Sequence, residues 1–235
     1  MTALVNSCIL LLCGLFMLPG QVAGSTAEEH LYLRKTGAES SYFNWRLEPG
    51  TLLRLITDLQ QERDITRMNA DLETREWSVK DPAQKIDLQV TRRDNSLLMT
   101  GLFKGSTISR EVSIDDAPWY QALSLSLRQF TNPNRDHLEF WSIRPDTLDV
   151  HKLQVTRSGE ELVDMNGTMT KAIKLKIQLT GLKSMFWSCH YWLRKEDGLF
   201  IRYQGPSGPP GWPETIVELV APPTHAMSDP AGDGQ

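Results

Sequence analysis

Cysteine is scarce in this sequence, which holds three cysteines among its 235 residues. Two of them, Cys8 and Cys13, lie in an apolar N-terminal run that we expect to be removed, which leaves Cys189 alone. A single cysteine forms no intrachain disulfide, so the fold must rest on its hydrophobic core. Exported proteins of this size without disulfides are typical of the bacterial periplasm, and we expect that compartment here.

An excess of positive charge is missing as well. The chain carries 25 Lys and Arg against 29 Asp and Glu, a formal net charge of −4. Proteins that bind nucleic acid generally show a basic balance, so we expect no nucleic-acid partner.

Motifs that identify a catalytic or metal site are also absent. The sequence contains no G-x-S-x-G, HExxH or CxxC pattern and no phosphate-binding glycine loop. The five histidines (His30, His137, His151, His190 and His225) lack the i, i+2 or i, i+4 spacing of metal ligands. Cys189 and His190 are adjacent, and adjacent side chains of a strand point to opposite faces, so they do not form a nucleophile–base pair. We predict no catalytic residue, no metal and no cofactor.

The long apolar run of the chain lies near its N-terminus. It spans residues 8–18 and is followed by the small residues Val22, Ala23 and Gly24. The run is well below the roughly 20 residues needed to cross a bilayer, whereas its length and the small residues fit a secretory signal peptide. We therefore predict a signal peptide over residues 1–24, cleavage near Gly24, a periplasmic mature protein and no transmembrane span after cleavage.

What the sequence does hold is alternation of apolar and polar residues, the period of half-buried strands. The pattern is clearest over residues 86–91, 173–179 and 185–194, and residues 199–203 continue it. Its apolar positions are Ile86, Leu88 and Val90; Ile173, Leu175, Ile177 and Leu179; Met185, Trp187, Cys189, Tyr191 and Leu193; and Leu199, Ile201 and Tyr203. These segments predict antiparallel strands with one apolar face.

Turn signals separate the predicted strands. Asn166-Gly167 and Asp197-Gly198 suit type I′ hairpins, in which both central residues need a positive φ. Lys104-Gly105 and Ser158-Gly159 are weaker examples of the same signal. Strands joined by such short turns are antiparallel neighbours.

One segment departs from alternation and predicts a helix over about residues 117–130. Asp115 and Asp116 supply a cap, and Pro118 would occupy the first turn, where a missing N–H costs nothing. Tyr120, Leu123, Leu127 and Phe130 then recur at helical spacing, before Asn132-Pro133-Asn134 ends the segment.

The chain therefore predicts one half-barrel-like domain over residues 25–221. A strand block (about 30–114) precedes the helix and a second one (about 137–221) follows it, with a Gly/Pro-rich loop at 205–213. Residues 222–235 are rich in Pro, Gly and Asp and predict a disordered tail. The predicted fold class is mainly β with a central helix, as a curved antiparallel sheet or unclosed β-barrel wrapped on one helix.

Aromatic residues favour two interpretations of the interior. Seven tryptophans and strands that are bulky on both faces fit either a filled aromatic core or a cavity for an apolar ligand. In the second case Trp187, Tyr191 and Leu193 would line the cavity, and Trp119 and Leu123 of the helix would act as a plug or lid. Arg110 is in register with the apolar residues Ile108, Val112 and Ile114. Its charge would meet an anionic headgroup there, or a partner within the core.

Several segments together resemble a known family. They are the helix Trp119–Phe130, the strand Ala172-Ile173-Lys174-Leu175, and Tyr191-Trp192-Leu193-Arg194 leading through Asp197-Gly198 to Leu199–Tyr203. This arrangement resembles an uncharacterised family of exported bacterial proteins, a domain of unknown function. That family is similar in architecture to the periplasmic lipoprotein carriers. The resemblance implies an unclosed antiparallel barrel that holds a helix against an apolar inner face, and it transfers no catalytic residue.

Three functional hypotheses follow. The first is a non-enzymatic periplasmic protein that binds an apolar ligand, or a lipidated or membrane partner, on the concave sheet face. Its partners would be a lipid, a lipoprotein or other envelope proteins. The second is a structural or assembly factor of the cell envelope, for example in polysaccharide export, that acts by protein contacts. The third is an enzyme that acts on carbohydrate or lipid.

Overall fold

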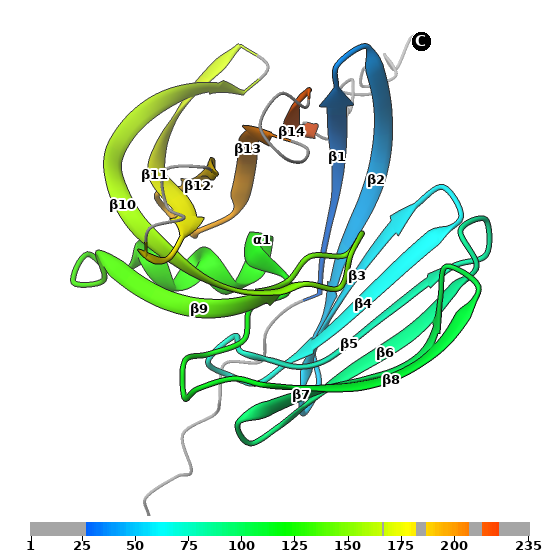
Figure 1. Ribbon diagram of the computed structural model, residues 1–235. Helices are drawn as coiled ribbons and strands as arrows, with labels where there is room; N and C mark the ends of the chain where they lie inside the picture. The colour runs from blue at the N-terminus through cyan, green and yellow to red at the C-terminus, as the bar shows by residue number, and fades with distance from the viewer. Residues whose placement is uncertain (1–26, 166, 182–186, 207–212, 221–235) are drawn as a thin grey trace, which may run out of the picture.

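The computed structural model describes residues 27–165, 167–181, 187–206 and 213–220 (Figure 1). In these residues fourteen strands form one antiparallel sheet. The strands are β1 (Glu28–Thr36), β2 (Glu39–Glu48), β3 (Leu53–Leu59), β4 (Glu62–Met68), β5 (Thr74–Asp81), β6 (Ile86–Arg93), β7 (Ser96–Phe103), β8 (Ser106–Ser113), β9 (His137–Ile143), β10 (Val150–Met165), β11 (Thr168–Leu179), β12 (Ser188–Arg194), β13 (Phe200–Pro206) and β14 (Glu214–Val220). The helix α1 (Leu123–Ser126) continues into the 3-10 helix η1 (Leu127–Thr131). The predicted mainly-β class with an unclosed antiparallel sheet is confirmed.

The strands follow the order β8-β7-β6-β5-β4-β3-β2-β1-β14-β13-β12-β11-β10-β9 across the sheet. Consecutive strands are therefore neighbours in the sheet, with the exception of β8 and β9, and the two halves join where β1 pairs with β14. The edges of the sheet are β8 and β9. Figure 1 shows the sheet curling into two concave lobes, one made by β9–β13 around α1 and the other by β3–β8.

The predicted alternation decides which face each strand buries. Ile86, Leu88 and Val90 of β6 are buried while Asp87 and Gln89 between them are exposed. Ile173, Leu175 and Ile177 of β11 are likewise buried, together with Cys189 and Leu193 of the paired strand β12. Because every second side chain is buried, each strand has one apolar face. Its burial stabilises the fold by about 25 cal/mol per Å² of apolar surface removed from water.

Alternation fails along residues 199–203, where a bulge changes the register. Leu193 pairs with Phe200, but the preceding Trp192 pairs with Arg202, so Ile201 is an extra residue on β13. Phe200 and Tyr203 consequently join the concave cluster, while Leu199 and Ile201 pack with Trp192. The prediction of one continuous apolar face through Leu199, Ile201 and Tyr203 is therefore wrong, because a bulge shifts the side-chain period by one residue.

Two large clusters of buried side chains occupy the two concave lobes. The larger one holds α1 and η1 against the sheet, with Trp45, Phe130 and Phe140 among its members. The other lies on β5–β8 and is built around Trp77 and Trp119. A third, smaller cluster contains Trp192, and its side chains lie on the face of the sheet opposite to the first cluster.

The helix predicted over about residues 117–130 is wrong in its first half. The nitrogen of Tyr120 donates to the carbonyl of Trp141 at 2.8 Å, and the nitrogen of Trp141 donates to the carbonyl of Pro118 at 2.8 Å. Trp119 thereby forms a parallel bridge with Trp141 of β9, and its carbonyl accepts a hydrogen bond from Thr74. Because strand partners use these backbone groups, helical bonding begins only after Ala122.

The turn at Lys104-Gly105 has its predicted geometry, whereas those at Asp197-Gly198 and Ser158-Gly159 differ from theirs. Lys104 and Gly105 both have positive φ, 50° and 81°, and form the two-residue connection between β7 and β8. At Asp197-Gly198 only the glycine has a positive φ, 73°, and the loop is longer than two residues. Gly159, at φ 137°, marks a bulge inside β10 rather than a turn. The β10–β11 hairpin closes between Met165 and Thr168, although Asn166 lies outside the described residues.

Several predictions concern parts of the chain that the structure does not describe. The signal peptide over residues 1–24, the tail over 222–235 and most of the loop over 205–213 stay predictions. Within the described residues, no helix has the length and apolar character needed to span a membrane.

Candidate functional site

Four of the six predicted ligand-contacting residues come together on one concave face. Leu193 of β12 is fully buried in the cluster around α1. Trp187, Tyr191 and Leu123 pack against that same cluster and remain half-buried. These four side chains share a face as predicted, but whether they bind a ligand stays a prediction.

The other two predicted residues belong to the second lobe. Trp119 precedes the helix rather than forming part of it, and its side chain is fully buried near Trp77. Arg110 lies on the edge strand β8, where its guanidinium donates to the carbonyl of Leu148 and lies 3.7 Å from the sulfur of Met99. Neither residue reaches the concave face that holds Tyr191 and Leu193.

Ring contacts link β1, β2, β12 and β13 across the concave face that holds Tyr191 and Leu193, which we call the first concave face. Tyr32 stacks on Phe43 and on Phe200, with ring centroids 5.3 and 5.2 Å apart. The ring of Tyr191 lies 5.5 Å from Phe200 and 5.1 Å from Tyr203. We call these five side chains the aromatic row. Tyr32 is fully buried, whereas Phe43, Tyr191 and Tyr203 are only half-buried.

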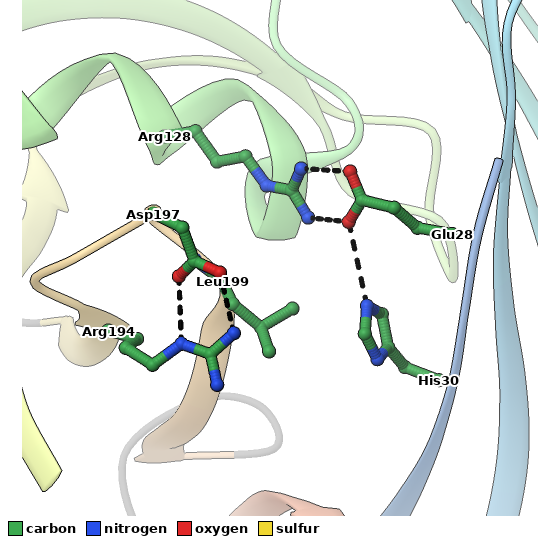
Figure 2. A pocket seen from close by; sticks show the side chains of 6 residues that line it. All are labelled: Glu28, His30, Arg128, Arg194, Asp197 and Leu199. Atoms are coloured by element: carbon green, nitrogen blue, oxygen red, sulfur yellow. Dashed lines mark hydrogen bonds and ion pairs between the residues drawn. The ribbon is translucent and has the colours of Figure 1, made fainter. Parts of the chain in front are cut away.

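A pocket of about 360 Å³ lies at the start of β1, between η1 and the turn that joins β12 to β13 (Figure 2). We call it the polar pocket; its lining is Glu28, His30, Arg128, Arg194, Asp197 and Leu199. Arg128 Nη1 and Nη2 donate to the two carboxylate oxygens of Glu28 at 2.7 and 2.6 Å. Arg194 Nε and Nη2 donate to the carboxylate of Asp197 at 2.8 and 2.5 Å.

The imidazole of His30 connects the polar pocket to the aromatic row. Its Nε2 lies 3.5 Å from Glu28 Oε2. Its ring centroid lies 5.3 Å from that of Trp45 and 6.5 Å from that of Tyr32. His30 therefore lies between the charged side chains of the polar pocket and the fully buried ring of Tyr32 in the aromatic row.

The two ion pairs set the charge states in the polar pocket. Hydrogen bonds from Arg128 hold the pKa of Glu28 below its usual range, and those from Arg194 do the same for the pKa of Asp197. Both carboxylates are therefore ionised at neutral pH. Burial lowers the pKa of His30, and the charges of Arg128 and Arg194 lower it further against the opposing effect of Glu28. The imidazole is accordingly neutral at pH 7.

Three elements far apart in the sequence assemble the polar pocket. Glu28 and His30 alternate along β1 and so share a face with Tyr32. The turn after β12 sits directly on η1 because residue 198 is glycine. A Cβ on Gly198 would lie 2.9 Å from Thr131 Cγ2 and 3.2 Å from the Arg128 Cβ.

Sequence reasoning missed the polar pocket, because no local pattern marks it. Glu28 and Arg128, which form its central ion pair, are 100 residues apart. The turn signal at Asp197-Gly198 located one wall, but it did not show which element that turn would contact. Alternation shows which face of β1 carries His30 only when the register of β1 is known.

The polar pocket is lined by two guanidinium groups, two carboxylates, one imidazole and one aliphatic side chain. Its six lining residues supply N–H donors and carboxylates, but no hydroxyl or thiol that would act as a nucleophile. Within the described residues, no group of three His, Cys, Asp or Glu side chains is arranged to hold a metal ion. Cys189 lies on the concave face and is buried, which raises the pKa of its thiol, while His190 packs near Trp192 on the opposite face.

Comparison with known proteins supports the fold. The chain is similar to the crystal structure of a β-barrel-like protein of the domain of unknown function DUF1849 from Brucella abortus, with a TM-score of 0.56 and 9% sequence identity. The match covers 82% of this chain and 94% of that one. The predicted likeness to a β-barrel-like bacterial domain of unknown function is confirmed, and at this identity it concerns the fold alone.

A second structure found by the comparison is a DUF1329 family protein from Desulfovibrio piger. Its TM-score is 0.28 at 11% identity, over 83% of each chain. No protein-family model matches the chain, and a search of curated protein sequences finds no match.

Proposed function

We propose that this protein is a non-enzymatic binding protein of the bacterial periplasm that holds the apolar part of a lipid or of a lipidated partner on its first concave face. One observation carries the proposal, namely that the aromatic row ends in side chains that water still reaches. Phe43, Tyr191 and Tyr203 come from β2, β12 and β13 and all remain half-buried. Trp187 extends this surface at the start of β12.

The driving force is the removal of the remaining aromatic surface from water. Covering apolar surface contributes about 25 cal/mol per Å². An apolar chain that covers Tyr191 and Tyr203, whose ring centroids lie 5.1 Å apart, therefore gains from two neighbouring half-buried rings at once. Aromatic rings also lose little side-chain entropy when they are covered, because they have only two rotatable side-chain bonds.

The helical segment covers part of the first concave face and leaves the remainder for such a guest. Leu125, Leu127 and Phe130 are fully buried against the sheet, so they fill the area that α1 and η1 cover. Trp45 Nε1 also donates to Ser124 Oγ at 3.0 Å, which ties α1 to β2. The proposed guest therefore lies beside the helical segment, on the half-buried rings, and does not replace it.

The test is native mass spectrometry with lipid extraction, on protein exported into a bacterial periplasm and purified without detergent. We expect a bound lipid or another apolar adduct in the wild-type protein. Tyr191→Ala should reduce retention about tenfold or more, because burying one large side chain contributes roughly 1.5–3 kcal/mol. Tyr42→Ala is the matched control, since Tyr42 lies on the opposite face of β2 and is 59% exposed.

Either of two outcomes would refute this proposal. One is a clean apo mass before and after incubation with envelope lipids. The other is equal loss of the adduct in Tyr191→Ala and Tyr42→Ala. Leu193→Asp is unsuitable for this test, because Leu193 is fully buried and a buried carboxylate would disturb the fold itself.

A second candidate is an assembly factor of the cell envelope that acts by protein contacts. Residues beyond Thr156 of β10 have no pairing with β9, so this part of the β10–β11 hairpin extends beyond the end of β9. Leu162 and Met169 in this part of the hairpin are each 58% exposed, which is unusual for large apolar side chains. A photo-crosslinking residue at Met169 should then capture an envelope protein in cells, whereas the same residue at Ser106 on β8 should not.

A further inference from the structure

The polar pocket holds more hydrogen-bond donors than acceptors. Each guanidinium has five N–H groups. Arg128 donates from its two terminal nitrogens to Glu28, and its Nε is buried without a hydrogen-bond partner among the described residues. Arg194 donates from Nε and Nη2 to Asp197, and Figure 2 shows its remaining nitrogen directed away from Asp197.

The carboxylates of the polar pocket are already engaged. Glu28 receives two hydrogen bonds from Arg128 and lies 3.5 Å from the imidazole of His30. Asp197 receives two hydrogen bonds from Arg194 and a third from the backbone nitrogen of Leu199 at 3.1 Å. A ligand that complements this lining must therefore bring acceptors of its own.

We propose that the polar pocket binds the phosphate group of a small phosphate ester. A phosphate offers several strong acceptor oxygens, and guanidinium groups bind it with directed, charge-assisted hydrogen bonds. The volume of about 360 Å³ lies within the range of roughly 300–1,000 Å³ that is usual for small-molecule sites. This volume accommodates a substituent as well as the phosphate itself.

The arrangement of charges supports a phosphate over a cationic ligand. Each carboxylate is neutralised by its own arginine, and the neutral imidazole of His30 adds no negative charge. The unused N–H groups belong to Arg128 and Arg194, which approach the pocket from η1 and β12 on the same side of β1 (Figure 2). An entering phosphate thus meets two guanidinium groups whose carboxylate partners are saturated.

Two sources would supply this group, the headgroup of a phospholipid and a free phosphate ester. The inference does not depend on the proposed function, because the polar pocket and the half-buried end of the aromatic row are separate surfaces. Glycerol 3-phosphate and a short-chain phosphatidic acid below its micelle concentration carry the same phosphate monoester. Isothermal titration calorimetry of both probes against the full mature protein separates the two sources.

The variants are chosen to move affinity in opposite directions. Arg194→Gln should weaken glycerol 3-phosphate binding about tenfold or more, because it removes a charge-assisted donor. Asp197→Asn should strengthen binding, since it releases Arg194 from its carboxylate while keeping an acceptor for the Leu199 nitrogen. Arg144→Gln is the matched control: Arg144 forms the same two-bond pair with Asp146, at 2.6 and 2.7 Å, but does not line the polar pocket.

Three results would overturn the inference. They are the absence of binding of both probes to the wild-type protein, an equal loss in Arg194→Gln and Arg144→Gln, and a loss rather than a gain in Asp197→Asn. Equal affinities for the two probes would support the inference with a free ester as the source. A tighter affinity for phosphatidic acid that Tyr191→Ala abolishes would support it with a lipid as the source. Phosphate binding in a protein that retains no lipid would refute the proposed function alone.

Discussion

Among single residues, Asp64 has an unusual environment for a carboxyl group. It lies on β4, where one carboxylate oxygen accepts a hydrogen bond from Trp77 Nε1 at 2.7 Å and the other lies 3.5 Å from the Thr66 hydroxyl. Burial raises the pKa of Asp64 to about 7, and the nearby charge of Glu62 adds to the increase. The carboxyl group therefore takes up a proton in the folded protein at a pH where it is ionised in the unfolded chain.

This shift makes stability depend on pH in a definite direction. The folded pKa of Asp64, about 7, exceeds the ordinary aspartate value of 3.8, so the folded state binds the extra proton. The contribution to stability is complete below pH of about 4 and is lost as the pH rises through about 7. One pKa unit corresponds to about 1.4 kcal/mol, so the loss is on the order of a few kcal/mol.

Asp64→Asn should therefore make the protein more stable at pH 8, because asparagine stays neutral and still accepts the Trp77 hydrogen bond. Urea unfolding at pH 5 and pH 8 measures this difference directly. Asp87→Asn is the control, since Asp87 is exposed and lies 3.5 Å from Lys80. A wild-type stability that rises between pH 5 and pH 8, with no gain in Asp64→Asn, would contradict this account.

At the scale of elements, two glycines show what a strand tolerates. Gly101 of β7 and Gly159 of β10 both have positive φ, 125° and 137°. A Cβ on Gly101 would lie 2.2 Å from the carbonyl oxygen of Asp87 on the paired strand β6, whereas a Cβ on Gly159 meets nothing within 4 Å. A side chain would therefore strain the backbone at both positions, but it would clash with the neighbouring strand only at Gly101.

Alanine substitution should separate these two contributions. Gly159→Ala should cost about 1–2 kcal/mol of unfolding free energy, the usual strain of a side chain at such a φ. Gly101→Ala should cost at least about 2 kcal/mol more, because β6 and β7 must move apart to admit the methyl group. Chemical denaturation of both variants tests the difference, and equal losses would show that the clash is relieved without cost.

The elements also show how far sequence reasoning reaches. The faces of β6 and β11 could be predicted because alternation is local, and burial follows it residue by residue. The start of the helix could not be predicted, since residues 117–121 have helical signals that are outweighed by hydrogen bonds to β9 and Thr74. The bulge at Ile201 was hidden for a similar reason, because the pairing with β12 decides which residue is extra.

Candidate site residues follow the same division. Tyr191 and Leu193 share a face because they alternate within one strand. Trp119 was assigned to the wrong lobe, because its partners Trp141 and Thr74 are distant in the sequence. The polar pocket combines both difficulties, since its members come from β1, η1, the end of β12 and the turn that follows, and of these segments only the turn carries a local sequence signal.

At the scale of the whole molecule, a short extended segment fastens the two lobes together. The side-chain amide of Gln121 donates to the carbonyl of Ile143 at 3.0 Å and accepts from its nitrogen at 3.1 Å. The backbone nitrogen of Gln121 donates to Thr74 Oγ1 at 3.0 Å, so the same residue also contacts the start of β5. Ile143 belongs to the second cluster while its strand β9 carries Phe140 of the first.

The lobes should therefore unfold together, as one cooperative unit with equal calorimetric and van't Hoff enthalpies. Gln121→Leu leaves two backbone groups of Ile143 without their partner, at about 1–3 kcal/mol for each buried group. We expect that loss to lower the melting temperature and to split the calorimetric transition. Gln129→Leu is the control, because the side chain of Gln129 bonds, among the described residues, to Ser126 of the helical segment, Tyr120 and Arg135. A single sharp transition in Gln121→Leu would mean that the shared sheet through β1 and β14 couples the lobes by itself.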